Sequence, residues 1–334
     1  MPKLIFDLQK AKEFVKKNNL KTIIIQIPEG LKTQATEICD EFSFCENVFT
    51  KTDPCFGACD LPLHDKNVLN ADCIVHIGHT GIHSNKNIVY VPLHYEISIE
   101  ETEAMGKKIV KELQKNKIDS VALIANAQYL SVLPELKKIL FKNEIKSFVG
   151  KGSERISYEG QILGCNYSVV ESIESAVQAT VYFGDGYFHP IGLVYSTKKK
   201  VFVANPLSKK VEEISEKRDR LLRKRYGAIA RASDAKRFGI IVSTKSGQRR
   251  KELALELKKA IERKGKKAYL LECDLINESY FIGIDVDCLV NTACNRIVLD
   301  DAENWKKLII NPTECLIAID EKSWKEWIPD ELER

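Results

Sequence analysis

Ten cysteines occur in this 334-residue chain, and two of them stand close together in the stretch Asp53–Asp60. The stretch reads Asp-Pro-Cys-Phe-Gly-Ala-Cys-Asp, which gives Cys55 and Cys59 a Cys-x3-Cys spacing. Thiolates bind zinc ions and iron–sulfur clusters, but such sites take three or four protein ligands. Two cysteines are therefore too few, and further ligands must come from other parts of the chain.

Two other cysteines share the local setting of Cys59. Cys59, Cys165 and Cys294 each lie in a predicted loop and directly follow a glycine or an alanine. Small neighbours let the backbone approach a bulky inorganic group closely. If three similar domains pack around a pseudo-threefold axis, these thiols meet at its centre and give a [4Fe-4S] cluster three ligands, with one iron open. The spacing alone is equally compatible with three unrelated buried thiols.

Polar residues in other predicted loops are candidates for binding a substrate. The segment Ser243–Gln248 lies between a predicted strand and the N-terminus of a predicted helix, where carboxylates and phosphates bind readily. We therefore take Gly247 and Gln248 as candidate binding residues, although the complete glycine-rich nucleotide motifs are absent. Asp185 and His189 follow another predicted buried segment, and they either line the same central cavity or only shape a turn.

Three histidines, His76, His79 and His83, form a His-x2-His-x3-His pattern. His76 and His79, together with a nearby cysteine, make a zinc-dependent hydrolase an alternative function. However, His76 lies in a predicted strand and the other two lie in the loop after it, so the three do not share a helical face. We therefore favour a polar contact between His79 and the central cleft.

The elements that must position these residues form three blocks. Within each block, apolar runs of the buried-strand type alternate with turns and helical patterns, which is the signature of parallel α/β units. The opening strands are expected at 21–27, 120–125 and 238–242, and a later strand is expected at 192–195.

We predict an α/β protein with three similar Rossmann-like domains arranged around a central cluster site. Blocks of about 100 residues have the usual size of a domain. The predicted domains are residues 1–103 with Cys59, residues 104–215 with Cys165, and residues 216–334 with Cys294.

The formal net charge of +4 hides a basic segment at residues 209–237. This segment holds eleven Lys and Arg residues against five Asp and Glu residues. It either steers an acidic partner, as in a nucleic-acid-binding module, or forms a solvated helix between two domains. Few aromatic residues accompany the charges for base stacking, so we favour the solvated helix and expect no direct nucleic-acid contact.

Residues 1–20 mix charged and apolar side chains and show no signal-peptide pattern. No apolar run approaches the ~20 residues that a membrane span needs. We therefore expect a cytoplasmic protein without membrane contact, whose thiols stay reduced. Five further cysteines are then expected to be small core residues: Cys39, Cys73, Cys273, Cys288 and Cys315.

Three motifs together, Phe56–Asp60, Gly160–Cys165 and Val290–Cys294, resemble the archaeal diphthamide synthase family. The resemblance spans essentially the whole chain, and the set of motifs is more specific than any one of them. It implies a homodimeric 2-(3-amino-3-carboxypropyl)histidine synthase, the enzyme of the first step of diphthamide biosynthesis.

By this resemblance, Cys59, Cys165 and Cys294 bind the [4Fe-4S] cluster of a noncanonical radical S-adenosylmethionine enzyme. Such an enzyme transfers the 3-amino-3-carboxypropyl group to a histidine of translation elongation factor 2 and releases methylthioadenosine. Cys55 is then a packing thiol, because a fourth cysteine would close the iron that S-adenosylmethionine needs. The family commonly has proline after the third cysteine, whereas this chain has Asn295, and we expect only a local backbone adjustment there.

Overall fold

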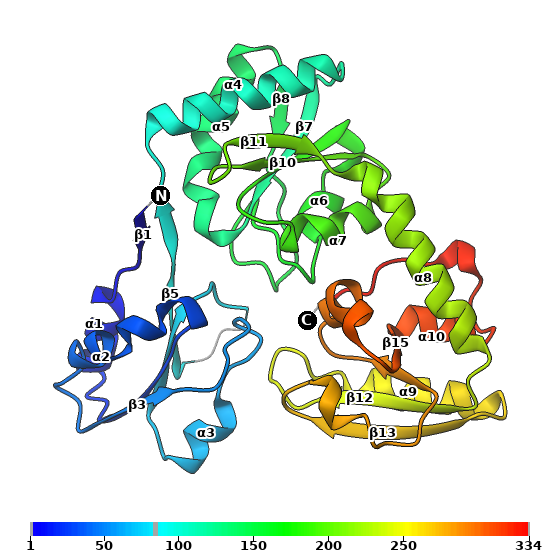
Figure 1. Ribbon diagram of the computed structural model, residues 1–334. Helices are drawn as coiled ribbons and strands as arrows, with labels where there is room; N and C mark the ends of the chain where they lie inside the picture. Colours follow the sequence, from blue (N-terminus) through cyan, green and yellow to red (C-terminus); the bar gives the residue numbers. More distant parts are fainter. Residues whose placement is uncertain (1–2, 83–85, 333–334) are drawn as a thin grey trace.

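A computed structural model describes residues 3–82 and 86–332 of the chain. Figure 1 shows three α/β lobes at the corners of a triangle, with loops of each lobe facing a shared centre. We describe them as lobe one (residues 3–98), lobe two (99–217) and lobe three (218–332). In the described parts of the chain, no helix combines the length and the apolar character that crossing a membrane requires.

Lobe one is built on a parallel sheet with the strand order β3-β2-β4-β5. The central strands are apolar and almost fully buried, as expected for a sheet that is covered on both faces. The strands are β2 (Thr22–Gln26), β3 (Asn47–Lys51), β4 (Cys73–Gly78) and β5 (Ile88–Pro92), with a small antiparallel pair of β1 (Lys3–Ile5) and β6 (His94–Glu96). The helices are α1 (Gln9–Lys17), η1 (Glu29–Gln34), α2 (Ala35–Asp40) and α3 (Leu63–Val68).

Lobe two contains a five-stranded sheet with the order β11-β10-β9-β7-β8, in which only β11 is antiparallel to its neighbour. The strands are β7 (Ser120–Ala125), β8 (Lys146–Phe148), β9 (Ala179–Phe183), β10 (Lys200–Asn205) and β11 (Lys210–Glu213). The helices are α4 (Ile99–Lys115), η2 (Ala127–Val132), α5 (Leu133–Lys142), α6 (Ser168–Glu171), η3 (Glu174–Ala176), α7 (Phe188–Ser196) and η4 (Ser215–Lys217). A capping box between Ser98 and Glu101 starts α4.

Lobe three contains a parallel sheet with the order β13-β12-β14-β15. The strands are β12 (Arg237–Ser243), β13 (Lys267–Cys273), β14 (Cys288–Asn291) and β15 (Leu308–Ile310). The helices are α8 (Arg218–Ser233), α9 (Lys251–Arg263), η5 (Glu278–Tyr280), η6 (Ile297–Asp301), η7 (Ala302–Asn304), α10 (Pro312–Ala318) and η8 (Trp324–Glu326).

The three sheets repeat one strand order. In each lobe the first long strand lies between the second and the third, and the fourth lies beside the third, which gives β3-β2-β4-β5, β8-β7-β9-β10 and β13-β12-β14-β15. All of these neighbours pair in parallel. The predicted fold class of three similar Rossmann-like α/β units is therefore confirmed.

The predicted domain boundaries can be compared with the helices and strands of the structure. The first expected boundary, residue 103, falls inside α4, which packs against α5 and β11 of lobe two. Residue 215, the second expected boundary, begins η4, and the following helix α8 packs against β15 and α10 of lobe three. We propose that the domains divide before α4 and after η4.

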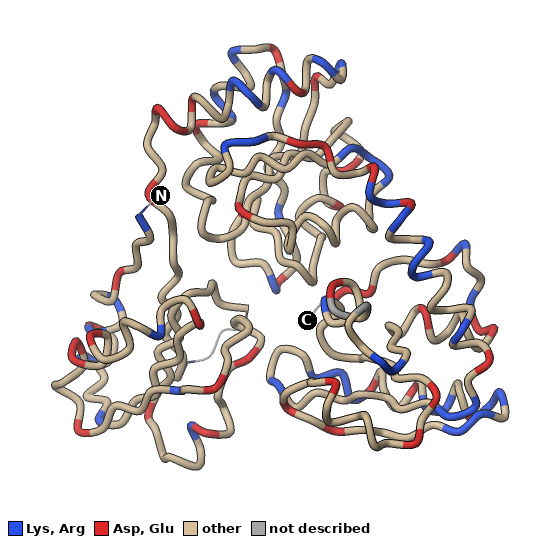
Figure 2. Tube along the Cα trace, in the orientation of Figure 1, with Lys and Arg blue, Asp and Glu red and all other residues tan. Residues whose placement is uncertain are grey.

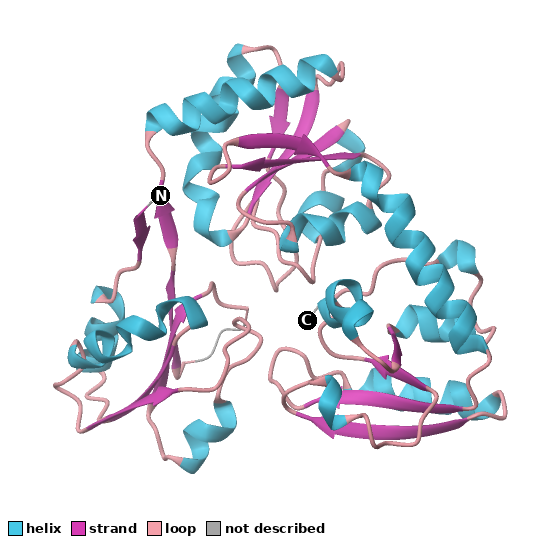
Figure 3. Cartoon of the chain, in the orientation of Figure 1, coloured by secondary structure: helices cyan, strands magenta, loops and turns pink. Residues whose placement is uncertain are grey.

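Two segments differ from their predicted secondary structure. Residues 192–195, predicted as a strand, belong to helix α7, which is drawn in cyan in Figure 3. A short apolar run fits a buried strand and a buried helix equally well, and Pro190 is tolerated because it lies in the first turn of α7. The basic segment 209–237 is not one helix, since it begins with β11; Figure 2 shows Lys and Arg spread along α8.

Candidate metal centre

Three cysteines lie in loops at the carboxyl ends of parallel strands, where α/β sheets usually place their ligands. Cys59 follows β3, Cys165 follows β8 and Cys294 follows β14. In chain order, β3 and β8 are the second strands of the main sheets of lobes one and two, whereas β14 is the third strand of the sheet of lobe three. The cysteines therefore come from three different lobes, but Cys294 does not occupy the equivalent loop.

The three thiols are near enough to interact electrostatically, although they do not form a group in which all ligand atoms lie within 4.8 Å of one another. Burial raises the pKa of each. Burial and then the thiols of Cys165 and Cys59 raise the pKa of Cys294 to about 12, and Cys59 also raises the pKa of Cys165. One charge shifts the pKa of another group in this way only at short range. The fold thus brings together three sulfur atoms that are far apart in the sequence.

Gly247 and Gln248, taken from the sequence as binding residues, both contact Cys59. The Gly247 amide donates to the Cys59 carbonyl at 2.9 Å, and the Gln248 side chain donates to the Cys59 sulfur at 3.3 Å. A β-carbon on Gly247 would stand 2.5 Å from the Cys59 α-carbon, so only glycine fits there. Lobe three therefore holds the cysteine of lobe one in place.

A C-terminal strap, residues 330–332, ties the other two cysteine loops together. The Leu332 amide donates to the Cys165 carbonyl at 2.9 Å. The Asn295 side chain donates to the Asp330 carbonyl at 2.5 Å, and Asn295 itself is fully buried. This amide contact gives Asn295 a specific role in fixing the Cys294 loop.

Two buried arginines lie beside the thiols. Arg155 donates to the Gly247 carbonyl at 2.7 Å, and its positive charge lowers the pKa of Cys59 and Cys165 against the effect of burial. Arg296 pairs with Asp300 at 2.5 Å and stacks over the Phe188 ring, 4.6 Å from its centroid. No motif in the sequence marks Arg155, because its only signal is an arginine in a loop near Cys165.

His189 lies near Arg296 and His79, and Asp185 lines a cavity together with His189. Burial first, then Arg296 and His79, lower the pKa of His189 to about 4, so these side chains are neighbours. Asp185 accepts a hydrogen bond from Asn126 at 3.3 Å and shares a cavity of about 400 Å³ with His189. The structure therefore brings His79 of lobe one and His189 of lobe two next to each other.

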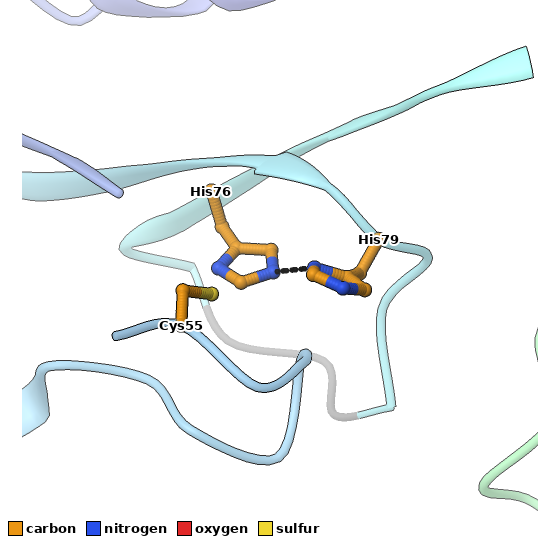
Figure 4. Close-up of side chains that lie close together, drawn as sticks. All are labelled: Cys55, His76 and His79. Atoms are coloured by element: carbon orange, nitrogen blue, oxygen red, sulfur yellow. Dashed lines mark hydrogen bonds between the residues drawn. The ribbon is translucent and has the colours of Figure 1, made fainter. Parts of the chain in front are cut away.

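A second group of possible metal ligands consists of Cys55, His76 and His79, shown in Figure 4. One ligand atom of each lies within 4.8 Å of the others. His83, the third histidine of the sequence pattern, lies outside the described residues. The group thus contains the two histidines of the zinc alternative and a cysteine near them.

Hydrogen bonds within the protein already occupy both ring nitrogens of His76. Gln26 donates to the Asp60 carbonyl at 2.6 Å, so the Gln26 amide oxygen faces His76 Nδ1, 2.7 Å away, and accepts its hydrogen. His76 Nε2 then accepts from His79 Nδ1 at 3.0 Å (Figure 4). Both histidines are neutral near neutral pH, because burial lowers the pKa of His76 to about 3 and that of His79 to about 4.

Acidification should weaken the fold through His76. The pKa of His76 in the folded state lies below the unfolded value of about 6.5. As the pH falls below 6.5, His76 therefore binds a proton in the unfolded state but not in the folded state, which favours unfolding. Between about pH 7 and about pH 5, His76 should cost the folded state about 2 kcal/mol. Urea unfolding at both pH values measures this loss, which should shrink in His76→Gln and persist in the exposed control His64→Gln. An unchanged pH dependence in His76→Gln would contradict the assignment.

Comparisons of the sequence and of the structure with known proteins lead to the same family. A family model for diphthamide synthesis proteins matches residues 27–329. The 2-(3-amino-3-carboxypropyl)histidine synthase of Pyrococcus horikoshii is 32% identical over 91% of this chain and 87% of its own length. That of Methanocaldococcus jannaschii is 31% identical over 90% of this chain and 85% of its own length. The crystal structure of Dph2 from Pyrococcus horikoshii with a 4Fe-4S cluster covers 99% of this chain and 95% of that chain, with a TM-score of 0.89 and 30% identity.

Proposed function

The chain belongs to the diphthamide synthesis family, and from this premise we propose its reaction. Its relatives are 2-(3-amino-3-carboxypropyl)histidine synthases, and this chain is an enzyme of that type. We propose that it transfers the 3-amino-3-carboxypropyl group of S-adenosylmethionine to a histidine of translation elongation factor 2. A carbon–sulfur bond breaks, a carbon–carbon bond to the imidazole forms, the imidazole loses a proton and methylthioadenosine leaves. We further propose radical chemistry and a cytoplasmic homodimer.

Cys59, Cys165 and Cys294 are the proposed ligands of a [4Fe-4S] cluster. The observation that carries this proposal is the convergence of three thiols, one from each lobe. Three thiolates leave one iron for the substrate, and the two buried arginines suit an anionic group. The residues present therefore fit a cluster of this kind, and the similar Pyrococcus horikoshii structure contains a 4Fe-4S cluster.

The residues around the thiols bind and orient the substrate in this proposal. When bound, the cluster supplies the electron that cleaves the carbon–sulfur bond. Arg296 is 4% exposed, and its Nε and one terminal nitrogen have no hydrogen-bond partner among the described residues, so it is suited to the carboxylate of S-adenosylmethionine. His189 lies beside it, and Gln248 holds the sulfur of Cys59.

Arg296→Lys should weaken binding of S-adenosylmethionine. Lysine keeps the positive charge but loses the planar fork that binds a carboxylate through two parallel hydrogen bonds. Loss of one charged hydrogen bond should cost about 1.5–3 kcal/mol, or roughly 10–100-fold in affinity. Equilibrium dialysis measures the affinity, and Arg220→Lys on the exposed face of α8 serves as the control. Wild-type affinity in Arg296→Lys would exclude this residue as the carboxylate ligand.

One anaerobic assay tests the reaction itself. The chain is reconstituted with iron and sulfide, reduced, and mixed with unmodified elongation factor 2 and S-adenosylmethionine labelled in its aminocarboxypropyl group. We expect one label on a histidine of the factor for each methylthioadenosine released. Release of 5′-deoxyadenosine without labelling of the factor would instead show cleavage of a different carbon–sulfur bond and would contradict the proposal.

Two alternatives make different predictions in the same preparation. A zinc hydrolase built on Cys55, His76 and His79 would hold stoichiometric zinc that survives removal of the other three cysteines. A nucleic-acid-binding module built on residues 209–237 would need neither metal and would show salt-sensitive affinity for nucleic acid. Metal analysis and a binding titration in salt therefore separate the three functions.

A further inference from the structure

Arg155 is a buried cation whose hydrogen-bonding capacity is largely unused. Its side chain is 2% exposed and comes from the loop between β8 and α6. One terminal nitrogen donates to the Gly247 carbonyl at 2.7 Å. Its Nε and its other terminal nitrogen have no nitrogen or oxygen partner among residues 3–82 and 86–332, and the side chain interacts with the Cys165 thiol. Buried donors are normally satisfied, so these nitrogens point to a group that binds there.

The charge of Arg155 is also uncompensated within the described chain. No carboxylate in those ranges forms an ion pair with it, whereas the similarly buried Arg225 pairs with Glu314 at 2.6 Å. A buried charge without a partner is costly and persists only when something compensates it. The fold therefore holds the buried Arg155 cation at a position where an anion can bind.

The position of Arg155 identifies which anion that is. Its guanidinium lies next to the sulfurs of Cys59 and Cys165 and acts electrostatically on both. The same Gly247 that accepts its hydrogen bond donates to the Cys59 carbonyl at 2.9 Å. Arg155 thus connects the cysteine loops of lobes one and two with the Gly247 turn of lobe three.

We propose that Arg155 is the charge partner of the anionic centre held by Cys59, Cys165 and Cys294, and that it sets the reduction potential of this centre. The proposal rests on the proposed function, because it requires a cluster on these cysteines. Taking up one electron from an external reductant adds one negative charge to the centre. A nearby cation stabilises that charge, so Arg155 makes the reduction more favourable. Arg155 acts as a positioning residue and not as a ligand.

The test compares Arg155→Gln, which removes the charge, with Arg155→Lys, which keeps it. Arg225→Gln is the matched control, because it removes a buried arginine that pairs with Glu314 instead of the thiols. Each protein is loaded with cluster anaerobically and titrated with dithionite in a spectroelectrochemical cell. Iron and sulfide per chain, the melting temperature and the affinity of the oxidised protein for S-adenosylmethionine are measured in parallel.

Arg155→Gln should lower the equilibrium constant for one-electron reduction by roughly tenfold or more, which is a shift of about 59 mV to more negative potential. Arg155→Lys and Arg225→Gln should keep the wild-type potential. If Arg155→Gln holds no cluster, a loaded Arg155→Lys with the wild-type potential still supports the proposal.

Three results would overturn the proposal. The first is a wild-type potential in Arg155→Gln. The second is a fall in S-adenosylmethionine affinity without a change in potential, which would make Arg155 a substrate ligand. The third is loss of the cluster from both Arg155 variants at an unchanged melting temperature. This result would show that the shape of the arginine side chain, and not its charge, is needed to hold the cluster. A wild-type chain without any cluster on the three cysteines would instead overturn the proposed function, so the two failures are distinguishable.

Discussion

Replacing Cys59, Cys165 or Cys294 with alanine should in each case remove the iron–sulfur cluster and abolish transfer to elongation factor 2. Each change deletes one of three proposed ligands from a different lobe, and two remaining thiols are too few to hold a cluster. Iron and sulfide per chain, the visible absorption of the reconstituted protein and labelling of the factor measure the effect. Both the cluster and the activity should fall to background in all three variants.

Cys55→Ala is the matched control for these variants. Cys55 lies four residues before Cys59 and is buried, and its sulfur lies within 4.8 Å of ring nitrogens of His76 and His79. A fourth cysteine ligand would close the iron that the proposal leaves open for S-adenosylmethionine, so Cys55 is expected to be a packing thiol. The variant should retain the cluster and most of the activity. A full cluster in all three ligand variants, or its loss from Cys55→Ala, would show that the ligands are assigned wrongly.

Lys245→Met should be strongly destabilising, because it breaks a buried ion pair between lobes one and three. The Lys245 ammonium lies 2.5 Å from one carboxylate oxygen of Asp60, and both side chains are at most one-tenth exposed. Removing one partner of a buried pair typically costs about 3–5 kcal/mol, since the other charge is left unpaired. Urea unfolding at neutral pH should show this loss. Because Asp60 follows Cys59 directly, cluster retention should fall as well.

A double change separates the charge from the packing. In Lys245→Met combined with Asp60→Asn, no buried charge is left unpaired, because the second partner of Lys245, Asp274, is exposed; part of the lost stability should therefore return. Lys258→Met is the control, because Lys258 pairs with Glu262 on the more exposed surface of α9, where such pairs contribute at most about 1 kcal/mol. A loss in Lys245→Met no larger than that of Lys258→Met would show that the two lobes do not depend on this contact.

The repeated strands were the most predictable part of the fold. Each apolar run such as 21–27, 120–125 or 238–242 has a composition that suits a strand covered on both faces, and all three became the first long strand of a sheet. Residues 192–195 were predicted wrongly, because four apolar residues carry no period that separates a strand from a helix. The long helix α4 was missed, although Ser98 and Glu101 form a capping box at its start.

The candidate site was predictable only in part. The cysteines could be found, because their residue type and small neighbours limit the chemistry. Their convergence depends on how three lobes pack, which no local pattern encodes. Arg155 was missed for the same reason: a loop arginine acquires its role only when burial separates it from water and the Gly247 turn of another lobe fixes its guanidinium. The burial of Arg296 and its ion pair with Asp300 likewise became visible only in the structure.

The unequal position of Cys294 bears on how such a site can arise. The loop of lobe one that is equivalent to the Cys294 loop follows β4 and carries His79, and that of lobe two follows β9 and carries Asp185. A ring of three identical one-domain subunits would present the same loop three times and would offer three equivalent cysteines. This set of sulfurs therefore requires three units that differ in sequence, which a single chain with three lobes supplies. The differences between the three lobes, and not rotational symmetry, define the composition of this set of sulfurs.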